Sequence, residues 1–163
     1  MNIPLHSRKY PDLNAVIDDE DYELVSQYRW YPRWDKNSQS FYAMAGIKKN
    51  NKWVTMMMHR LILGLTNPKI LCDHKNHNGL FNVRSNLRIV TNQQNMMNRQ
   101  SRIGTSRYRG VYWKRETEKW AAQIGYNKTK THLGYFDNEI DAARIYNKKA
   151  KELFGEYAYL NNV

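Results

Sequence analysis

Asp73 and His74 stand side by side in a stretch, from Cys72 to Asn95, that contains no other acidic residue. The surrounding segment 56–106 carries seven arginines or lysines and this one acid, a net charge of +6. A carboxylate repels an anionic substrate, so a phosphate-binding segment should retain one only where it holds a cation. An aspartate and an asparagine carbonyl can hold Mg²⁺ while water and a phosphate complete its shell. A neighbouring histidine, which ionises near neutral pH, can act as a general base. The pair could therefore serve phosphodiester hydrolysis.

The composition of the whole chain favours a partner of high negative charge. Its 163 residues carry a formal charge of +11 with a pI of about 9.7, and segments 1–55 and 107–163 have net charges of +1 and +4. A field of this sign attracts nucleic acid first and anionic membranes second. No apolar run reaches the roughly 18 residues of a membrane span, and the N-terminus lacks a signal-peptide core, so we expect a soluble cytoplasmic protein.

The single cysteine, Cys72, excludes an internal disulfide and a four-cysteine zinc ribbon. Cys72, His74 and His77 could suggest a zinc site, but one thiol without a paired Cys-x-x-Cys disfavours zinc. The asparagines that surround the histidines are interpreted as turn and loop formers: Asn76, Asn78, Asn82 and Asn92.

The elements that must position Asp73 and His74 can be predicted from the pattern. The short apolar segment 57–63, followed by a glycine, predicts a helix and its end. Strands are expected over 69–73 and 87–90, joined by a polar loop. If the first strand stays regular, Asp73 and His74 point to opposite faces, and only a turn or loop that begins at His74 lets both serve one site.

A further helix is expected to begin at Thr91, because Thr91 and Gln94 form a capping-box pattern, and Asn95 falls in its first turn. Upstream, segment 1–55 combines strand-like runs with an acidic helix candidate at 18–27 and is interpreted as a small supporting sheet. The strand-like runs are 13–17, 28–34, 41–47 and 52–57.

The central residues resemble the HNH nuclease family, specifically the phage and intron-encoded HNH homing endonucleases whose last motif position is asparagine. The pattern is Asp73-His74, then Asn86 twelve residues beyond His74 in SNLR, then Asn95 nine residues further in TNQQN. The resemblance covers residues 24–98 and includes MHRLILG upstream. Relatives often carry Asp-Asn-Arg where this chain has Phe-Asn-Val at 81–83.

The resemblance implies a ββα-metal site with a defined role for each motif residue. Asp73 and Asn95 would ligate one divalent ion, Mg²⁺ or Mn²⁺. His74 would be the general base that activates water, and Asn86 would brace the loop and orient His74. Further residues of this region are candidates for contact with DNA: His59, Arg60, Arg84, Arg88, Arg99 and Arg102.

Residues 107–163 show a different pattern. Three strand-like runs, 107–114, 119–126 and 129–136, are followed by a predicted helix at 137–155 with Asp137 as its expected N-cap. The apolar face expected for this helix comprises Ile140, Ala143, Tyr146, Ala150 and Leu153.

This second unit resembles the ethylene-response-factor, or AP-two, type of DNA-binding domain over residues 107–161. The resemblance rests on Tyr108-Arg109-Gly110-Val111, Lys119-Trp120-Ala121-Ala122, Leu133-Gly134-Tyr135-Phe136, Ala142-Ala143-Arg144-Ile145-Tyr146 and Leu160-Asn161. It implies a sheet that lies in the major groove of DNA, which admits a β-ribbon. Gln123, Gly125 and His132 depart from plant members, so a plant-like sequence preference is not carried over.

Several residues of this unit are candidates for DNA contact, and Arg109 is the expected base contact. The candidates are Arg107, Arg109, Trp113, Lys114, Arg115, Lys119, Trp120, Lys130 and Tyr135. The alternative for Trp120 and Phe136 is that they pack the sheet on the helix.

We therefore predict an α+β chain in four parts. These are a β-rich support region at 1–55, a ββα-metal HNH module at 56–98, a basic linker at 99–106, and a three-stranded antiparallel sheet on one helix at 107–163. The predicted function is a site-recognising, metal-dependent endonuclease of the homing or mobile-element type that cuts double-stranded DNA as a monomer in a bacterial host cell, with neither a membrane partner nor a small-molecule substrate. Two alternatives stay open: a non-enzymatic DNA-binding regulator with a decayed nuclease module, and a structure-specific or RNA-directed binder.

Overall fold

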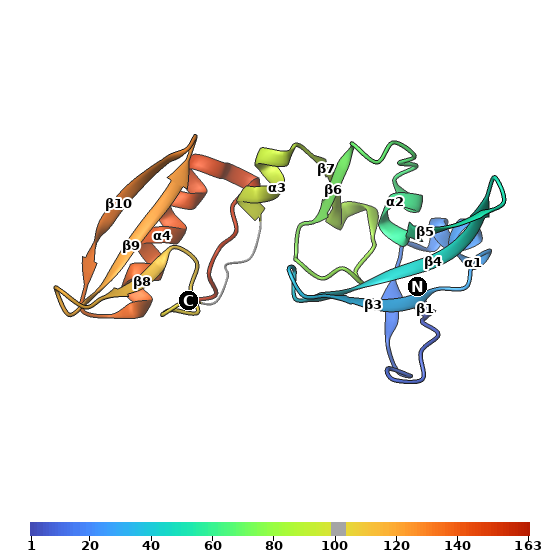
Figure 1. Cartoon of the computed structure of the whole chain (residues 1–163), viewed down its shortest axis with the longest axis horizontal. Coiled ribbons are helices and arrows are strands. Elements are labelled where there is room, and N and C mark those ends of the chain that lie inside the picture. Colours follow the sequence, from blue (N-terminus) through green and yellow to red (C-terminus); the bar gives the residue numbers. More distant parts are fainter. Residues whose placement is uncertain (99–103) are drawn as a thin grey trace. The chain divides into compact units, whose positions relative to one another are not determined.

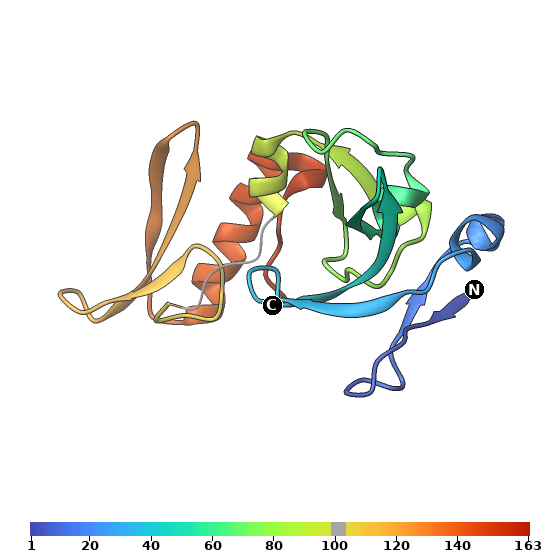
Figure 2. The same cartoon turned by 45° about the vertical axis from the view of Figure 1, so that its right-hand side comes forward.

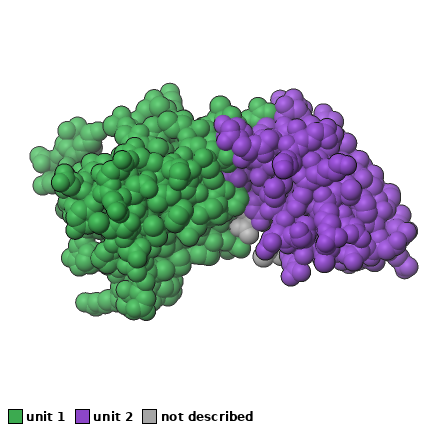
Figure 3. Space-filling view, turned by 180° about the vertical axis from the view of Figure 1, so that it is seen from behind, with its two compact units in different colours: residues 1–95 green, residues 96–163 purple. Residues whose placement is uncertain are grey.

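The structure, a computed structural model, describes residues 1–98 and 104–163 and divides the chain into two compact units, 1–95 and 96–163 (Figure 3). Most of the predicted linker, with Arg99 and Arg102, lies outside the described residues. The predicted α+β class is confirmed, because small antiparallel sheets of two or three strands are combined with short helices.

The first unit contains a small sheet in which β4 lies between β3 and β5 (Figure 1). A two-residue turn, Asn50 and Asn51, with positive φ angles joins β4 to β5, as expected of a tight hairpin. The elements up to this hairpin are β1 (Asn2–Pro4), β2 (Asn14–Val16), η1 (Asp19–Asp21), α1 (Tyr22–Ser26), β3 (Tyr31–Asp35), β4 (Ser40–Lys49) and β5 (Lys52–Met57).

The rest of the first unit is a second hairpin flanked by helices. Its elements are α2 (Met58–Ile62), β6 (Leu71–His74), η2 (Arg84–Asn86), β7 (Leu87–Val90) and α3 (Asn92–Asn98), the last of which crosses the boundary between the units. The predicted capping box is confirmed: the Thr91 amide donates to Gln94 Oε1 at 2.8 Å, and the Gln94 amide donates to Thr91 Oγ1 at 3.2 Å.

One hydrophobic core holds the first unit together. It joins side chains from β1, β2, α1, β4, α2 and β7, among them Ile3, Val25, Met58 and Leu87. The predicted parts 1–55 and 56–98 therefore share this core, while the four-part division stays a prediction. No helix in the part of the chain that the structure describes is long and apolar enough to cross a membrane.

The second unit is a three-stranded sheet, in the order β10–β9–β8, with one long helix against a face of it (Figure 2). Its elements are β8 (Val111–Lys114), β9 (Lys119–Tyr126), β10 (Thr129–Phe136), α4 (Glu139–Phe154) and η3 (Gly155–Tyr157). Val111 and Ala122 of the sheet pack against Ala142 and Ala143 of α4, and small side chains at these positions let helix and sheet approach closely.

Two predictions about α4 were wrong. The N-cap is Asn138, whose Oδ1 accepts from the Ile140 amide at 2.7 Å, and not Asp137; both residue types cap well, so sequence alone could not choose between them. Ile140 was expected on the apolar face but is 37% exposed. The buried face comprises Ala142, Ala143, Tyr146, Ala150 and Phe154.

Candidate active site

Asp73 and His74 are the last two residues of β6. Asp73 is opposite Arg88 and His74 is opposite Leu87 in a regular antiparallel register, so the two side chains leave the strand on opposite faces. The loop 75–86 begins directly after His74, so the turn expected at His74 itself is absent, and the convergence of Asp73 and His74 on one site stays a prediction. Burial lowers the pKa of His74, and the hydrogen bond with Asn82 and the charge of Asp73 oppose this shift only in part.

His74 is buried among polar and aromatic side chains. It is 4% exposed, and its Nε2 is 3.0 Å from Oδ1 of Asn82. Its ring centroid is 5.0 Å from that of His59 and 5.7 Å from that of Tyr42, both edge-on. Burial lowers the pKa of His74 below its ordinary value, since a charge is costly away from water. The imidazole is therefore neutral at physiological pH, which is the form that can accept a proton.

His59 packs beside His74 as a second neutral imidazole. It is 5% exposed, and burial, with smaller contributions from His74 and Arg60, lowers its pKa to about 3. Arg60 donates to the carbonyl oxygens of Ile70 at 2.8 Å and Asn67 at 2.7 Å and so fixes the segment before β6. The predicted DNA contacts of His59 and Arg60 stay predictions, and in the structure these side chains support the surroundings of His74.

Asn86 fastens the loop that follows His74. It is 7% exposed, its Nδ2 donates to the Phe81 carbonyl at 2.7 Å and to Asn76 Oδ1 at 3.0 Å, and its Oδ1 accepts from the Asn76 amide at 3.1 Å. These bonds tie the start of the loop to its end. The predicted action of Asn86 on the orientation of His74 stays a prediction, whereas the amide bonded to His74 Nε2 belongs to Asn82.

Asn82 was interpreted as a turn or loop former, and it lies in the loop 75–86, but its side chain has a further contact that the sequence did not indicate. Asn76 and Asn78 do form turns, because their side-chain oxygens accept from the amides of Asn78 and Leu80 at 3.0 Å each. Asn82 is instead fully buried, with 0% of its surface exposed. No local pattern in the sequence marked Asn82 as a neighbour of His74.

Asp73 is held by a buried ion pair with Arg88. Arg88 Nε lies 2.7 Å from Asp73 Oδ1, and each side chain is 9% exposed. Asn95 lies in α3 with an exposed side chain. The oxygens of Asp73 and Asn95 are of the type that a hard divalent cation prefers. The donor chemistry thus fits Mg²⁺ or Mn²⁺, while the convergence of Asp73 and Asn95 on one ion stays a prediction.

Arg84, a predicted DNA contact, is bound to the acidic segment near the N-terminus. Its Nη2 lies 2.6 Å and its Nε 3.0 Å from the carboxylate of Asp21, which is 2% exposed. The Arg84 amide also donates to Asp18 Oδ2 at 2.6 Å. The bond to Asp21 is the largest cause of a raised pKa of Arg84. These contacts anchor the end of the loop 75–86 to η1.

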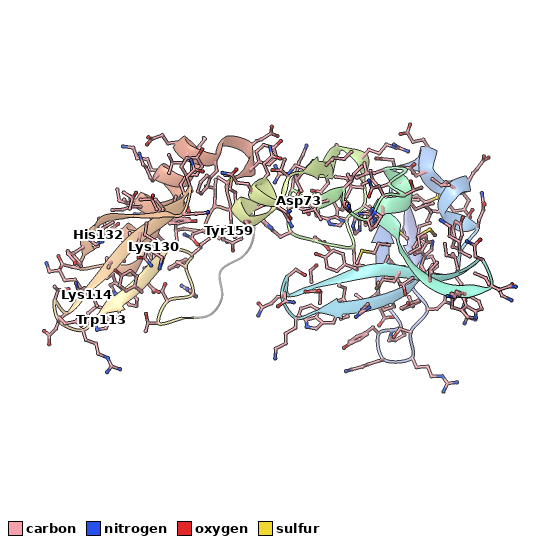
Figure 4. All side chains as sticks on the ribbon, turned by 45° about the horizontal axis from the view of Figure 1, so that its top comes forward. Asp73, Trp113, Lys114, Lys130, His132 and Tyr159 are labelled. Atoms are coloured by element: carbon pink, nitrogen blue, oxygen red, sulfur yellow. The ribbon has the colours of Figure 1, made fainter. Side chains whose placement is uncertain are left out.

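In the second unit, the predicted DNA contacts separate into two groups. Lys114, whose Nζ donates to Tyr135 OH at 3.0 Å, lies with Lys119 and Tyr135 at positions that alternate with the helix-facing residues of the sheet. Trp120 and Phe136 pack against the core under the sheet, so the packing alternative for these two is confirmed. Figure 4 labels four residues of this sheet: Trp113, Lys114, Lys130 and His132.

Arg109, the expected base contact, is engaged inside the second unit. Its guanidinium donates to the carbonyl oxygens of Met97 at 2.7 Å and Met96 at 3.1 Å, at the end of α3, and it lies 5.8 Å from the centre of the Tyr159 ring. Arg107 donates to Tyr108 OH at 3.0 Å, and Arg115 is exposed in the turn between β8 and β9. The assignment of Arg109 to a base stays a prediction.

Comparison with known proteins places the chain in a family. No protein-family model and no solved structure matches it. An uncharacterized HNH endonuclease of Acanthamoeba polyphaga mimivirus is 31% identical over an alignment of 154 residues, which covers 91% of this chain and 75% of that relative. The chain belongs to the HNH endonuclease family.

Proposed function

We propose that this protein is a divalent-metal-dependent endonuclease that hydrolyses phosphodiester bonds in double-stranded DNA, of the homing or mobile-element type, and acts as a monomer. The observation that carries the proposal is the setting of His74 in a chain of the HNH endonuclease family. His74 is a buried, neutral imidazole at the junction of a strand and a braced loop, with a hydrogen bond on Nε2.

The chain's own residues suffice to describe the proton transfer. His74 accepts a proton from water while the water oxygen forms a bond to phosphorus. The bond from phosphorus to the 3′ oxygen breaks, and that oxygen keeps the electron pair and later takes a proton from solvent. Asp73 and Asn95 would hold the divalent ion, which when bound supplies positive charge for the leaving 3′ oxygen.

Binding of DNA is supported by exposed basic and aromatic side chains on both units. In the second unit, the proposed AP-two-type reader offers Lys114, Lys130 and Tyr135 on a sheet of a size that the major groove admits. In the first unit, Trp53 is 76% exposed on β5, directly opposite Lys48 on β4. A basic, aromatic surface of this kind suits phosphates and bases.

The proposal is tested by incubating the purified protein with DNA that contains its own genomic locus. Mg²⁺, Mn²⁺ and EDTA are compared, and cut positions are mapped on each strand. We expect defined cuts with either metal and none with EDTA, and binding that falls steeply with salt because counterions are released. Binding without cutting under every metal condition would contradict the proposal.

One observation favours a second candidate, a non-enzymatic DNA-binding regulator. The carboxylate of Asp73, the proposed metal ligand, is already compensated by Arg88 in a buried ion pair. In a decayed nuclease module, this pair would be purely structural. The regulator predicts site-specific binding that neither metal alters, which the same experiment distinguishes.

A further inference from the structure

Asn82 is a buried polar residue whose side chain is only partly satisfied by hydrogen bonds. It is 0% exposed, and its Nδ2 is the one buried side-chain nitrogen or oxygen without a hydrogen-bond partner in residues 1–98 and 104–163. Buried polar atoms almost always have a hydrogen-bond partner. A buried amide whose nitrogen lacks one therefore indicates that the amide is retained for a contact of its oxygen. That oxygen is Oδ1, which is 3.0 Å from Nε2 of His74.

The backbone holds Asn82 in place independently of His74. The Asn82 amide donates to the Val16 carbonyl at 2.7 Å, and the Val16 amide donates to the Leu80 carbonyl at 2.8 Å. Phe81 lies between these bonds and pairs with Val16 in a parallel bridge. Because β2 holds this segment through both backbone bonds, the position of Asn82 does not depend on its contact with His74.

The chemistry of the two groups determines which nitrogen of His74 carries the proton. An amide oxygen only accepts hydrogen bonds, and a neutral imidazole has one N–H and one lone pair. Contact with Oδ1 therefore requires the proton on Nε2 and places the lone pair on Nδ1. The rings of His59 and Tyr42, at 5.0 Å and 5.7 Å, pack against the imidazole and oppose its rotation.

We propose that Asn82 is a positioning residue that selects the Nε2–H tautomer of His74 and so makes Nδ1 the nitrogen that receives the proton of the attacking water. The catalytic part of this statement rests on the proposed function, while the tautomer does not. When Nδ1 takes the proton from water, both ring nitrogens carry hydrogen, and Nε2–H keeps its bond to Asn82. Asn82 Oδ1 can therefore accept the hydrogen bond from Nε2–H both before and after the proton transfer.

The reverse orientation of the amide predicts the opposite state, which makes the proposal measurable. With Nδ2 toward His74, the lone pair would lie on Nε2, buried against Asn82, and the proton on Nδ1. Nitrogen-15 NMR of histidine-labelled, metal-free full-length protein distinguishes the two tautomers from the shifts of the ring nitrogens. The signal of His74 among the five histidines is assigned by its loss in His74→Gln.

Two variants of Asn82 and one matched control complete the experiment. Asn82→Leu removes the acceptor at similar size, Asn82→Asp keeps an oxygen there, and Asn78→Ala changes an exposed asparagine of the same loop. We expect the wild type, Asn82→Asp and Asn78→Ala to show the Nε2–H tautomer and Asn82→Leu to show a mixture. In single-turnover cleavage, Asn82→Leu should lose at least about tenfold in rate at unchanged DNA affinity, and Asn82→Asp should lose far less.

A wild-type protein with the Nδ1–H tautomer would overturn the proposal, even if Asn82→Leu did not fold. An unchanged tautomer in a folded Asn82→Leu protein would overturn it as well. Circular dichroism and thermal denaturation establish whether each variant is folded. The tautomer is measured without DNA or metal. A protein that does not cut DNA would refute the proposed function, and NMR would still decide whether Asn82 selects the tautomer of His74.

Discussion

Asp73 and Arg88 face each other across β6 and β7 and form a two-point ion pair, with Nε 2.7 Å from Oδ1 and Nη2 3.3 Å from Oδ2. Both side chains are 9% exposed. A buried carboxylate requires positive charge nearby, and Arg88 supplies it in the structure. In the proposed active enzyme, a divalent cation adds to that charge. The ion should therefore partly replace Arg88 in neutralising the Asp73 carboxylate.

The first prediction follows from this pair. Arg88→Met leaves the Asp73 carboxylate buried without its partner, so the free energy of unfolding should fall by about 3–5 kcal/mol in EDTA. Mg²⁺ should then raise the melting temperature more in this variant than in the wild type, as measured by calorimetry. The double variant Asp73→Asn/Arg88→Met is the control and should respond least to Mg²⁺. Equal responses in all three proteins would argue against metal binding at Asp73.

A second prediction concerns the dependence of stability on pH. The pKa of His59 is lowered to about 3 in the folded protein, whereas an unfolded histidine titrates near 6.5. Between these values the unfolded chain binds more protons, so the free energy of unfolding should fall as the pH decreases from about 6.5 toward 3 and be unaffected above 6.5. The lowered pKa of His74 acts in the same direction.

The measurement is urea denaturation from pH 8 to pH 4. His59→Gln should reduce the slope by up to about 1.4 kcal/mol per pH unit, which is the contribution of one proton. His6→Gln, at an exposed histidine of the same unit, is the matched control. A slope that His59→Gln does not change would show that His59 takes up its proton in the folded protein.

A third prediction tests the anchor of the loop 75–86. Asp21→Ala removes the buried carboxylate that holds Arg84 by two bonds and should lower the free energy of unfolding by about 1–2 kcal/mol, since bonds to charged groups are strong but the Arg84 side chain is 46% exposed. Glu20→Ala is the control: Glu20 also pairs with Arg84 at 3.1 Å but is 70% exposed, so its loss should cost less than about 1 kcal/mol. The free energies of unfolding are measured by denaturant titration. Equal losses in Asp21→Ala and Glu20→Ala would show that burial of Asp21 does not strengthen its pair with Arg84.

A fourth prediction concerns the sheet of the second unit. Lys114→Ala and Lys130→Ala should each weaken DNA binding at low salt and reduce the slope of log affinity against log salt by about 1, if each lysine contacts a phosphate. Lys148→Ala, an exposed lysine on α4, should leave the slope unchanged. The measurement is fluorescence anisotropy at several salt concentrations, and a loss only in Lys148→Ala would place the DNA on the helix instead of the sheet.

Elements with strong local signals could be predicted from the sequence. The bounds of β5 and β7 agree with the predicted 52–57 and 87–90, because β-branched and aliphatic residues lie between clear turn or capping residues. β1 was missed, because three residues that end in proline are too few to show an alternation of apolar and polar side chains. It forms because Ile3 is opposite Ala15 in β2 and enters the common core.

The site was less predictable, because its contacts join distant segments. Local alternation indicated that Asp73 and His74 would point apart, and the register of β6 with β7 confirms this. The neighbours of His74 come from β4, α2 and the loop 75–86, and no local pattern marks Tyr42, His59 or Asn82 as these neighbours. The partners of Arg84 and Arg88 likewise come from other segments, so both arginines were predicted only as DNA contacts.

The role of His74 as the group that takes the proton from water is tested by the substitution His74→Ala. Single-turnover cleavage with Mg²⁺ and DNA binding in EDTA are measured on the same preparation, with His77→Ala as the control in the same loop. His74→Ala should lose about 100-fold or more in cleavage rate while it keeps its DNA affinity, and His77→Ala should cut far better. Cleavage by folded His74→Ala at the wild-type rate would contradict this role.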